Sequence, residues 1–347
     1  MAACSSWSSL YVDNLEGVCV CNETHCDSVS NEYLSLTAGQ VGVFTTSQAG
    51  ARLEYNEIRI DGSPVSSPTF SVDASTQYQS IIGFGGAFTD STAINIYKLS
   101  PKLQNLLLDQ YFSEKGIQYT LGRVSIGSND FSTSIYSYND VEGDLAMENF
   151  SIDVDKLPNS HKIELIHRVL NMTSRDIKLF AGEPGDEYWK ALALYYSRFI
   201  DAYKKEGINC GRDIIGDLNS YASGWTDWNM ALDTEGEPDW AKNHVDSPIL
   251  VDAENGAEFY KQPMFYFMGH FSKFVPAGSR RVKLSVSDDA DSELQSCAFV
   301  TPEKQVVIQF LNFELSEEVV SVEQSDSSTF TVVVPAHSMV TAIVPAA

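Results

Sequence analysis

The chain has 347 residues, 43% of them hydrophobic, which is enough for one large core or for two domains. Its 47 acidic residues against 23 basic ones give a formal net charge of −24. This balance argues against nucleic acid as a partner, because binding phosphates requires clustered Lys and Arg, and no apolar run is long enough for a membrane-spanning helix.

Four of the six cysteines crowd the start of the chain, at Cys4, Cys19, Cys21 and Cys26. Four thiols in so short a segment indicate either two disulfides or a metal site. Zinc favours C-x-x-C spacing, which this segment fits poorly, so we expect disulfides and no metal. Three sequons, at Asn22, Asn149 and Asn171, also favour an oxidising, lumenal compartment. The first residues, Met1 to Trp7, lack the basic start and apolar run of a signal peptide.

Short alternating segments at both ends of the chain predict antiparallel strands. They cover residues 42–46, 52–56, 281–286, 305–312, 329–334 and 340–344. We expect residues 31–75 and 279–347 to combine into one β-sandwich, with residues 1–30 as a disulfide-linked segment. Residues 76–278 then form a separate middle domain.

The middle domain begins with an apolar strand that runs into the glycines of Gly83-Phe84-Gly85-Gly86. These glycines match neither G-x-G-x-x-G nor a P-loop, so close backbone packing at a strand end is favoured over phosphate binding. The elements expected after them are helices over 91–99, 103–112 and 163–170, strands from 119 and over 176–181, and a one-faced helix over 187–205.

Arg123 lies on the second expected strand of this domain, and Asp130 lies just beyond its end. In a parallel barrel, residues at the carboxyl ends of strands face the ligand. Asp130 is therefore placed to accept hydrogen bonds from sugar hydroxyls, and Arg123 to fix a neighbouring carboxylate. The alternative is an ion pair between the two that only holds the loop.

An aromatic stretch stands out near residue 225. Trp225 and Trp228 flank Asp227 and precede Asn229, and Trp240 follows. Flat aromatic faces with a few convergent polar groups suit a sugar, whose C–H face stacks while its hydroxyls bond to Asp and Asn. The competing interpretation, which local composition alone favours, is an aromatic core cluster.

Taken as one block, GWTDWNMALDTEGEPDWAKNHVDSPILVD followed by FYKQPMFYFMGHFSKFVPAGSRRV resembles the end of the barrel of animal lysosomal glucosylceramidases, retaining β-glucosidases of glycoside hydrolase family thirty. The resemblance covers residues 4–181, 184–207 and 211–345. It implies cleavage of the β-glucosidic bond of glucosylceramide in the lysosome, with a saposin-type activator and anionic lipid surfaces as partners. We expect no cofactor.

The resemblance also implies roles for single residues. Arg123, Asp130, Trp228 and Asn243 correspond to substrate-binding positions of the family. The family's pairing implies disulfides Cys4–Cys19 and Cys21–Cys26, with a glycan on Asn22. A lumenal protein of the lysosome or secretory pathway, presented without its leader, is the expected context.

The chain departs from the family in two places. After Ala181 it enters Gly182-Glu183-Pro184 instead of a Ser-Pro-Trp-rich loop, and after Asn209 it continues as the helix before the final strand. Barrel strands four to seven are then absent, through splicing or an incomplete gene model. The expected fold class is α/β plus all-β: an incomplete (β/α)8 barrel that keeps strands one to three and eight, with open edges prone to aggregation, beside the sandwich.

The missing strands matter for chemistry because retaining hydrolysis needs two carboxyls about 5 Å apart. Both family glutamates fall in the missing segments. Glu183 and Glu237 precede prolines but follow glycines, so neither is expected to substitute; Asp90, Asp130 and Asp227 remain near the presumed mouth. We therefore expect no turnover. The alternatives are an inactive relative that keeps glycan or lipid binding, and an interaction protein derived from the family.

Overall fold

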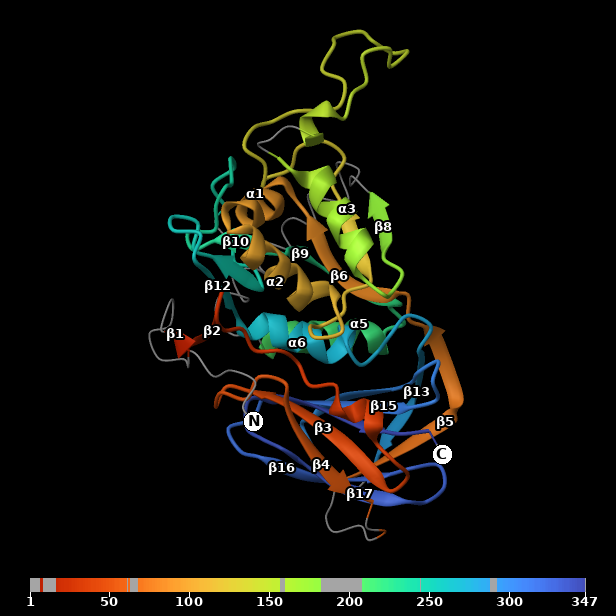
Figure 1. Cartoon of the computed structure of the whole chain (residues 1–347). Coiled ribbons are helices and arrows are strands. Elements are labelled where there is room, and N and C mark those ends of the chain that lie inside the picture. Colours follow the sequence, from red (N-terminus) through yellow and green to blue (C-terminus); the bar gives the residue numbers. More distant parts are fainter. Residues whose placement is uncertain are drawn as a thin grey trace.

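The computed structural model describes residues 7–8, 17–60, 62, 68–156, 160–181, 208–243, 245–287 and 292–346. Figure 1 shows three layers: a small parallel sheet with helices, then helices α5 (Ile208–Asn219) and α6 (Pro263–Ser272), then a large, mainly antiparallel sheet folded over on itself. Both α5 and α6 contact strands of the large sheet, and α6 also contacts the small one.

The large sheet has nine strands in the order β17-β16-β5-β13-β14-β15-β18-β3-β4. Its strands are β3 (Gln40–Ser47), β4 (Glu54–Arg59), β5 (Thr69–Ser80), β13 (Arg280–Val286), β14 (Gln295–Val300), β15 (Val306–Asn312), β16 (Glu318–Glu323), β17 (Thr329–Val334) and β18 (Ser338–Val344). One apolar cluster fills its interior, including Phe70, Phe310 and Phe330. The β-sandwich built from both ends of the chain is confirmed.

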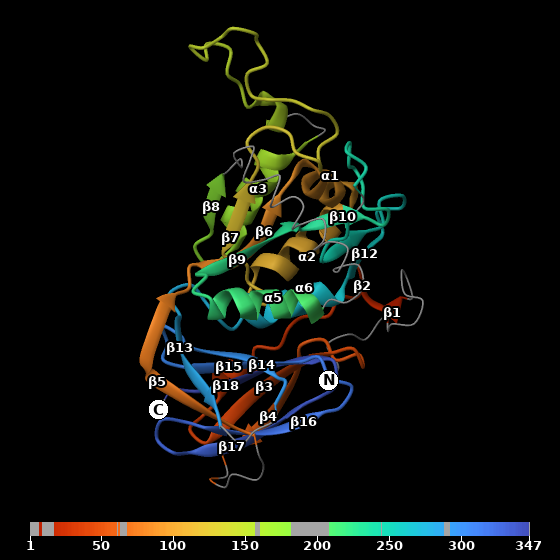
Figure 2. The same ribbon diagram turned by 180° about the vertical axis from the view of Figure 1, so that it is seen from behind.

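The small sheet has four parallel strands in the order β8-β7-β6-β9, which Figure 2 shows from behind. They are β6 (Gly83–Phe88), β7 (Leu121–Val124), β8 (Lys178–Ala181) and β9 (Gly224–Asn229). Three consecutive strands lie side by side, and the last pairs with the other edge of the first. This is the order of the first three and the final strand of a barrel, so the incomplete barrel is confirmed. Within the described residues, β8 and β9 each have one edge without a partner strand.

Glycines at the start of this sheet allow strands to approach closely. A Cβ on Gly85 would lie 1.8 Å from the carbonyl oxygen of Leu121, and one on Gly86 would lie 2.6 Å from Cγ of Met230. Neither position has room for a side chain. Close packing, and not phosphate binding, therefore accounts for the glycine run.

Two helices of the small sheet begin with a side-chain cap. The hydroxyl of Thr89 accepts a hydrogen bond from the amide of Thr92 at 3.1 Å, which caps α1 (Asp90–Lys98). Ser100 caps α2 (Pro101–Phe112), and α3 (Lys162–Met172) follows the second strand. The predicted helices over 91–99, 103–112 and 163–170 are confirmed to within two residues; the one over 187–205 lies outside the described residues.

Helix α6 is apolar on all sides, and Met264 to Ser272 are all buried. Its one imidazole, His270, lies between the hydroxyls of Thr46 on β3 at 2.9 Å and Thr341 on β18 at 2.8 Å. Burial lowers the pKa of His270 to about 3. The neutral ring thus ties the helix layer to the sandwich. No periodic pattern predicts this helix, because it has no polar face.

A third, mixed sheet joins the start of the chain to the barrel end. Its order is β1 (Trp7–Ser8), β2 (Val18–Asn22), β12 (Glu258–Lys261), β11 (Ile249–Val251) and β10 (Ala231–Asp233). The Cys21–Cys26 disulfide is present. Cys19 is also disulfide-bonded, but Cys4, its predicted partner, lies outside the described residues. Cys210 and Cys297 are both buried.

Three features of the described residues bear on membrane spans, metal ligands and glycan sites: helix hydropathy, clusters of ligating side chains and exposure of the sequons. No helix in the described ranges is long and apolar enough to cross a membrane. Across the same ranges, no group of three or more His, Cys, Asp and Glu side chains is arranged to hold a metal ion. Of the three sequons, Asn149 and Asn171 are exposed and Asn22 is half-buried, so glycosylation stays a prediction.

Candidate functional site

The four predicted binding residues come from two strands and two loops. Arg123 is on β7, Asp130 is in the loop after it, Trp228 is on β9, and Asn243 is in the loop that follows β10. Strand β6 lies between β7 and β9, and all three run parallel. Because the carboxyl ends of parallel strands meet at one edge, these residues gather at the same end of the sheet.

Asp130 and Asn243 bond directly to each other although 113 residues separate them. The side-chain amide of Asn243 donates to Oδ2 of Asp130 at 2.9 Å. Burial raises the pKa of Asp130; the Asn243 hydrogen bond acts in the opposite direction, and the nearby Asp239 carboxylate raises the pKa further. The pair presents a carboxylate acceptor and an amide donor together.

Arg123 and Trp228 form the second pair of the site. The Cζ atom of Arg123 lies 4.5 Å from the centre of the Trp228 ring, a cation–π contact. The same ring meets Phe131 edge-on, with 6.3 Å between centroids. The sequence left open whether Arg123 and Asp130 only pair with each other. In the structure Arg123 stacks on a half-buried indole, and Asp130 accepts from an amide.

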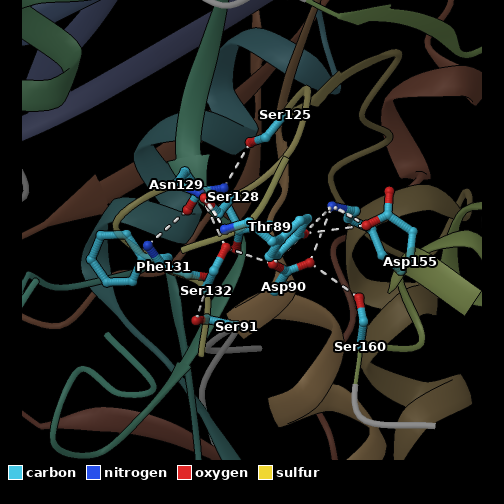
Figure 3. Close-up of polar contacts among 12 residues, drawn as sticks. Thr89, Asp90, Ser91, Ser125, Ser128, Asn129, Phe131, Ser132, Asp155 and Ser160 are labelled. Carbon is cyan, nitrogen blue, oxygen red and sulfur yellow. Dashed lines mark hydrogen bonds and ion pairs between the residues drawn. The ribbon is translucent and has the colours of Figure 1, made fainter. Parts of the chain in front are cut away.

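Local hydrogen bonds fix the loop that carries Asp130. Asn129 donates to the hydroxyl of Ser125 at 2.8 Å and accepts from the amide of Phe131 at 2.7 Å (Figure 3). The indole N–H of Trp240 donates to the carbonyl oxygen of Asn129 at 2.6 Å. Sequence reasoning missed Asn129. Its signal was an Asn followed by Asp and Ser in a turn, the residue types that bond to their own backbone.

Asp90, one of the carboxylates expected at the mouth, belongs to a buried ionic network. Nζ of Lys162 lies 3.1 Å from Oδ1 of Asp90 and 2.9 Å from Oδ1 of Asp155. Ser132 and Tyr136 donate to Oδ2 of Asp90, and Ser160 donates to Oδ1 (Figure 3). Both oxygens of Asp90 are therefore engaged in holding the long loop after β7. This role is structural.

Asp227, another carboxylate expected at the mouth, is set against the core. One of its oxygens accepts from the amide of Trp228 at 2.8 Å, and Oδ2 is buried without a hydrogen-bond partner. Burial raises the pKa of Asp227 to about 6. Its charge in turn raises the pKa values of Tyr111 and Tyr119, which are fully buried. That Asp227 lies near the mouth stays a prediction, and its charge also acts on core tyrosines.

Two further residues of the aromatic stretch and its continuation have local roles. The side-chain carbonyl of Asn229 accepts from the hydroxyl of Thr89 at 2.6 Å, at the start of α1. Oε2 of Glu237 accepts a hydrogen bond from the backbone amide of Asp239 at 2.6 Å, so this carboxylate stabilises the turn in which it lies. Glu183 lies outside the described residues.

Comparisons with known proteins agree with this architecture. The glycosyl hydrolase family 30 TIM-barrel domain matches residues 81–182 and 208–275, and the family 30 β-sandwich domain matches residues 278–342. The chain is 28% identical to lysosomal acid glucosylceramidase of Mus musculus, with 93% of this chain and 92% of that protein covered. It is also 28% identical to putative glucosylceramidase 3 of Caenorhabditis elegans, with coverages of 76% and 80%.

Solved structures share the fold at lower identity. SrfJ from Salmonella typhimurium aligns with a TM-score of 0.75 and 19% identity, covering 88% of this chain and 99% of that one. An endo-β-1,6-glucanase aligns with a TM-score of 0.69 and 16% identity, with coverages of 89% and 100%. At such identities the likeness concerns the fold alone.

The alignment with the mouse protein also measures what is missing. It extends over 480 positions, whereas 93% of 347 residues is about 323, so about 157 positions have no residue of this chain opposite them. The barrel match is interrupted at residue 182 and resumes at 208, beside the second expected departure from the family. With barrel and sandwich domains both matched and both sheets in place, the chain belongs to glycosyl hydrolase family 30.

Proposed function

We propose that this chain is a glucosylceramidase-type member of the family that binds a β-glucoside but does not hydrolyse it. The observation that carries the proposal is the meeting of Asp130 with Asn243, beside Arg123 stacked on Trp228, at the carboxyl ends of parallel strands. A carboxylate, an amide and an aromatic ring in one place are the groups that select a sugar.

The absence of turnover follows from what retaining hydrolysis requires, two carboxyls about 5 Å apart, one acting as nucleophile and one as acid and then base. The three aspartates of this end of the sheet are otherwise engaged. Asp90 pairs with Lys162, one oxygen of Asp227 accepts from the amide of Trp228 while the other is buried, and Asp130 is held by Asn243. The strand ends that carry both glutamates in the family are missing.

The natural ligand in this proposal is glucosylceramide or a related β-glucoside. A saposin-type activator and an anionic membrane surface are proposed as partners, in the lysosomal lumen or the secretory pathway. The name of the mouse relative supports this context, and so does the Cys21–Cys26 disulfide, since disulfides persist in oxidising compartments.

The test combines a hydrolysis assay with a binding assay on the purified chain. With a fluorogenic β-glucoside at acidic pH, we expect no release above a carrier-protein blank. With deoxynojirimycin, a glucose-shaped iminosugar, we expect saturable quenching or enhancement of tryptophan fluorescence. Asp130→Asn and Trp228→Ala should weaken that binding roughly tenfold or more, because each removes a directly contacting group.

The matched control is Asp153→Asn, which removes an exposed carboxylate far from the site's contacts, and binding should not change. Hydrolysis above the blank would overturn the non-catalytic part of the proposal. Fluorescence that does not respond to the iminosugar, or that responds equally in Asp130→Asn and Asp153→Asn, would overturn the binding part.

A further inference from the structure

The loop that carries Asn243, residues 237–243, is bonded to its surroundings at both ends. We name it the Asn243 loop. It follows β10 and contains a residue with left-handed backbone, Lys242, at φ 56°. An L-residue adopts that conformation only when surrounding contacts impose it. The question is which contacts hold this loop so that its last residue reaches Asp130.

Three backbone N–H groups of the loop donate hydrogen bonds to one carboxylate, that of Asp239. Oδ1 of Asp239 accepts from the amides of Ala241 at 2.9 Å and Lys242 at 3.1 Å, and Oδ2 accepts from the amide of Asn243 at 2.6 Å. Asp239 is only 4% exposed. Hydrogen bonds from backbone N–H groups to an ionised carboxylate are stronger than neutral ones. The side chain therefore fixes the backbone of three successive residues.

The start of the loop is anchored to helix α1. The amide of Asp239 donates to Oε2 of Glu237, and the carbonyl oxygen of Glu237 accepts from the side chain of Asn95 at 2.7 Å. The hydroxyl of Ser91 donates to the carbonyl oxygen of Pro238. Asn95 and Ser91 are fully buried on α1. The position of Asp239 is thus set by a rigid element.

The end of the loop reaches the site through two bonds. The side-chain amide of Asn243 donates to Oδ2 of Asp130 at 2.9 Å, and the indole N–H of Trp240 donates to the carbonyl oxygen of Asn129 at 2.6 Å. Both acceptors are in the loop after β7. The Asn243 loop therefore connects α1 to the Asp130 loop, with Asp239 at its centre.

We infer that Asp239 is a positioning residue for the sugar-binding pair Asp130 and Asn243. By holding the backbone of residues 241–243, it presents the side-chain amide of Asn243 to Asp130 and to a ligand hydroxyl. Only the effect on sugar binding rests on the proposed function; the effect of Asp239 on the backbone does not. A group held in its bound geometry before the ligand arrives loses less entropy on binding. In this role Asp239 acts through Asn243 and not on the ligand, because both of its oxygens already accept from backbone amides.

Electrostatics separate this role from a direct effect of charge. The Asp239 carboxylate raises the pKa of Asp130, so its charge opposes the ionised form of the acceptor. If charge were its main effect, removing it would leave binding unchanged or stronger. If geometry is its main effect, Asp239→Ala weakens binding and Asp239→Asn, which keeps one acceptor oxygen, restores part of it.

The experiment uses the full chain with the variants Asp239→Ala, Asp239→Asn and, as control, Asp153→Ala at an exposed position. Amide hydrogen exchange is measured without ligand at residues 241–243. We expect faster exchange there in Asp239→Ala, an intermediate rate in Asp239→Asn, and no change in Asp153→Ala. Deoxynojirimycin binding should weaken roughly tenfold in Asp239→Ala and roughly two- to threefold in Asp239→Asn.

Amide exchange tests the positioning role, and iminosugar binding by the unaltered chain tests the proposed function. If the unaltered chain does not bind the iminosugar, the proposed function fails, and exchange alone judges the positioning role. Unchanged exchange in Asp239→Ala, or equal iminosugar affinity in that variant and the unaltered chain, overturns the inference. If Asp239→Ala does not fold, Asp239→Asn decides: exchange must rise at 241–242 or at 243, and no rise at any of them overturns it.

Discussion

The sandwich and the half barrel of this chain differ in how completely they close. In the sandwich, the interior is one continuous apolar cluster, and the edge strand β4 carries charged Glu54, Glu57 and Arg59. In the half barrel, all four residues of the edge strand β8 are exposed, including Leu179 at 41% and Phe180 at 43%. The other edge strand, β9, holds Asp227 with its unpartnered buried oxygen.

The comparison shows that the half barrel exposes a whole strand where a neighbouring strand is missing. Strands β6 and β7 have partners on both sides and are buried or half-buried. The sandwich uses only the two ends of the chain, so a loss from the middle does not reach it. Local sequence still specifies β8 and β9 as strands, although it cannot supply the strands that would cover them.

The largest expected effect is on the half barrel, through Lys162. Replacing it with Met leaves Asp90 and Asp155 buried without a counter-ion, which costs about 3–5 kcal/mol. Urea titration followed by amide exchange should show the half barrel unfolding before the sandwich. Lys156→Met, which breaks an exposed pair with Asp153, should cost under about 0.5 kcal/mol. Equal losses in the two variants would contradict this prediction.

A second effect concerns the anchor between α6 and the sandwich. The folded-state pKa of His270, about 3, is below its ordinary 6.5, so its stabilising contribution is full above pH 6.5 and falls as pH drops toward 3. The loss is about 1.4 kcal/mol per pH unit, or about 2.7 kcal/mol at pH 4.5. His270→Gln should flatten this slope in thermal unfolding. His167→Gln, at an exposed position, should leave it unchanged, and a slope that survives His270→Gln would refute the assignment.

The half barrel should show the opposite slope, through Asp227. Its folded-state pKa, about 6, is above the ordinary 3.8, so its contribution is full below pH 3.8 and is lost as pH rises through 6. Because the side chain is partly exposed, we discount the effect to about 1–2 kcal/mol. Asp227→Asn should raise stability at pH 7 by that amount and have little effect at pH 4. If Asp227→Asn instead lowered stability at pH 7, the charge of Asp227 would be stabilised by its surroundings, and the prediction would be wrong.

The smallest expected effect on stability concerns the edge strands of the two sheets, where the expected difference is in self-association. Phe180→Lys on β8 should lower self-association severalfold in light scattering, because charged edge strands resist pairing with other chains, while changing the unfolding free energy by under about 0.5 kcal/mol. Val333→Lys on β17 is the control, since Val333 is 48% exposed on an edge of the sandwich. If the two variants lowered self-association equally, the chain would not associate through the edge of the half barrel.

Sequence patterns were sufficient for elements with a strong local signal. Alternation predicted residues 329–334, which match β17 to the residue, and the helix expected over 103–112 ends at Phe112 as α2 does. Strands β14 and β16 were not predicted, and neither were the short strands β10 to β12. Most of these have three or four residues or a weak polar alternation, so periodicity carries little information there.

The site was predictable only in part. Asp130 and Asn243 were named together because the chain resembles a family, since no local pattern relates residues 113 positions apart. The Lys162 network and the role of Asp239 were not predicted. Both depend on side chains that tertiary structure brings together, and an Asp in a turn has the same sequence signature whether it caps a local amide or supports a remote partner.

Helix α6 contacts both layers, through β6 on one side and through β3 and β18 on the other. It therefore keeps the half barrel docked on the sandwich. Under the proposed function, a chain that binds a β-glucoside without cleaving it would withhold that ligand from a hydrolase.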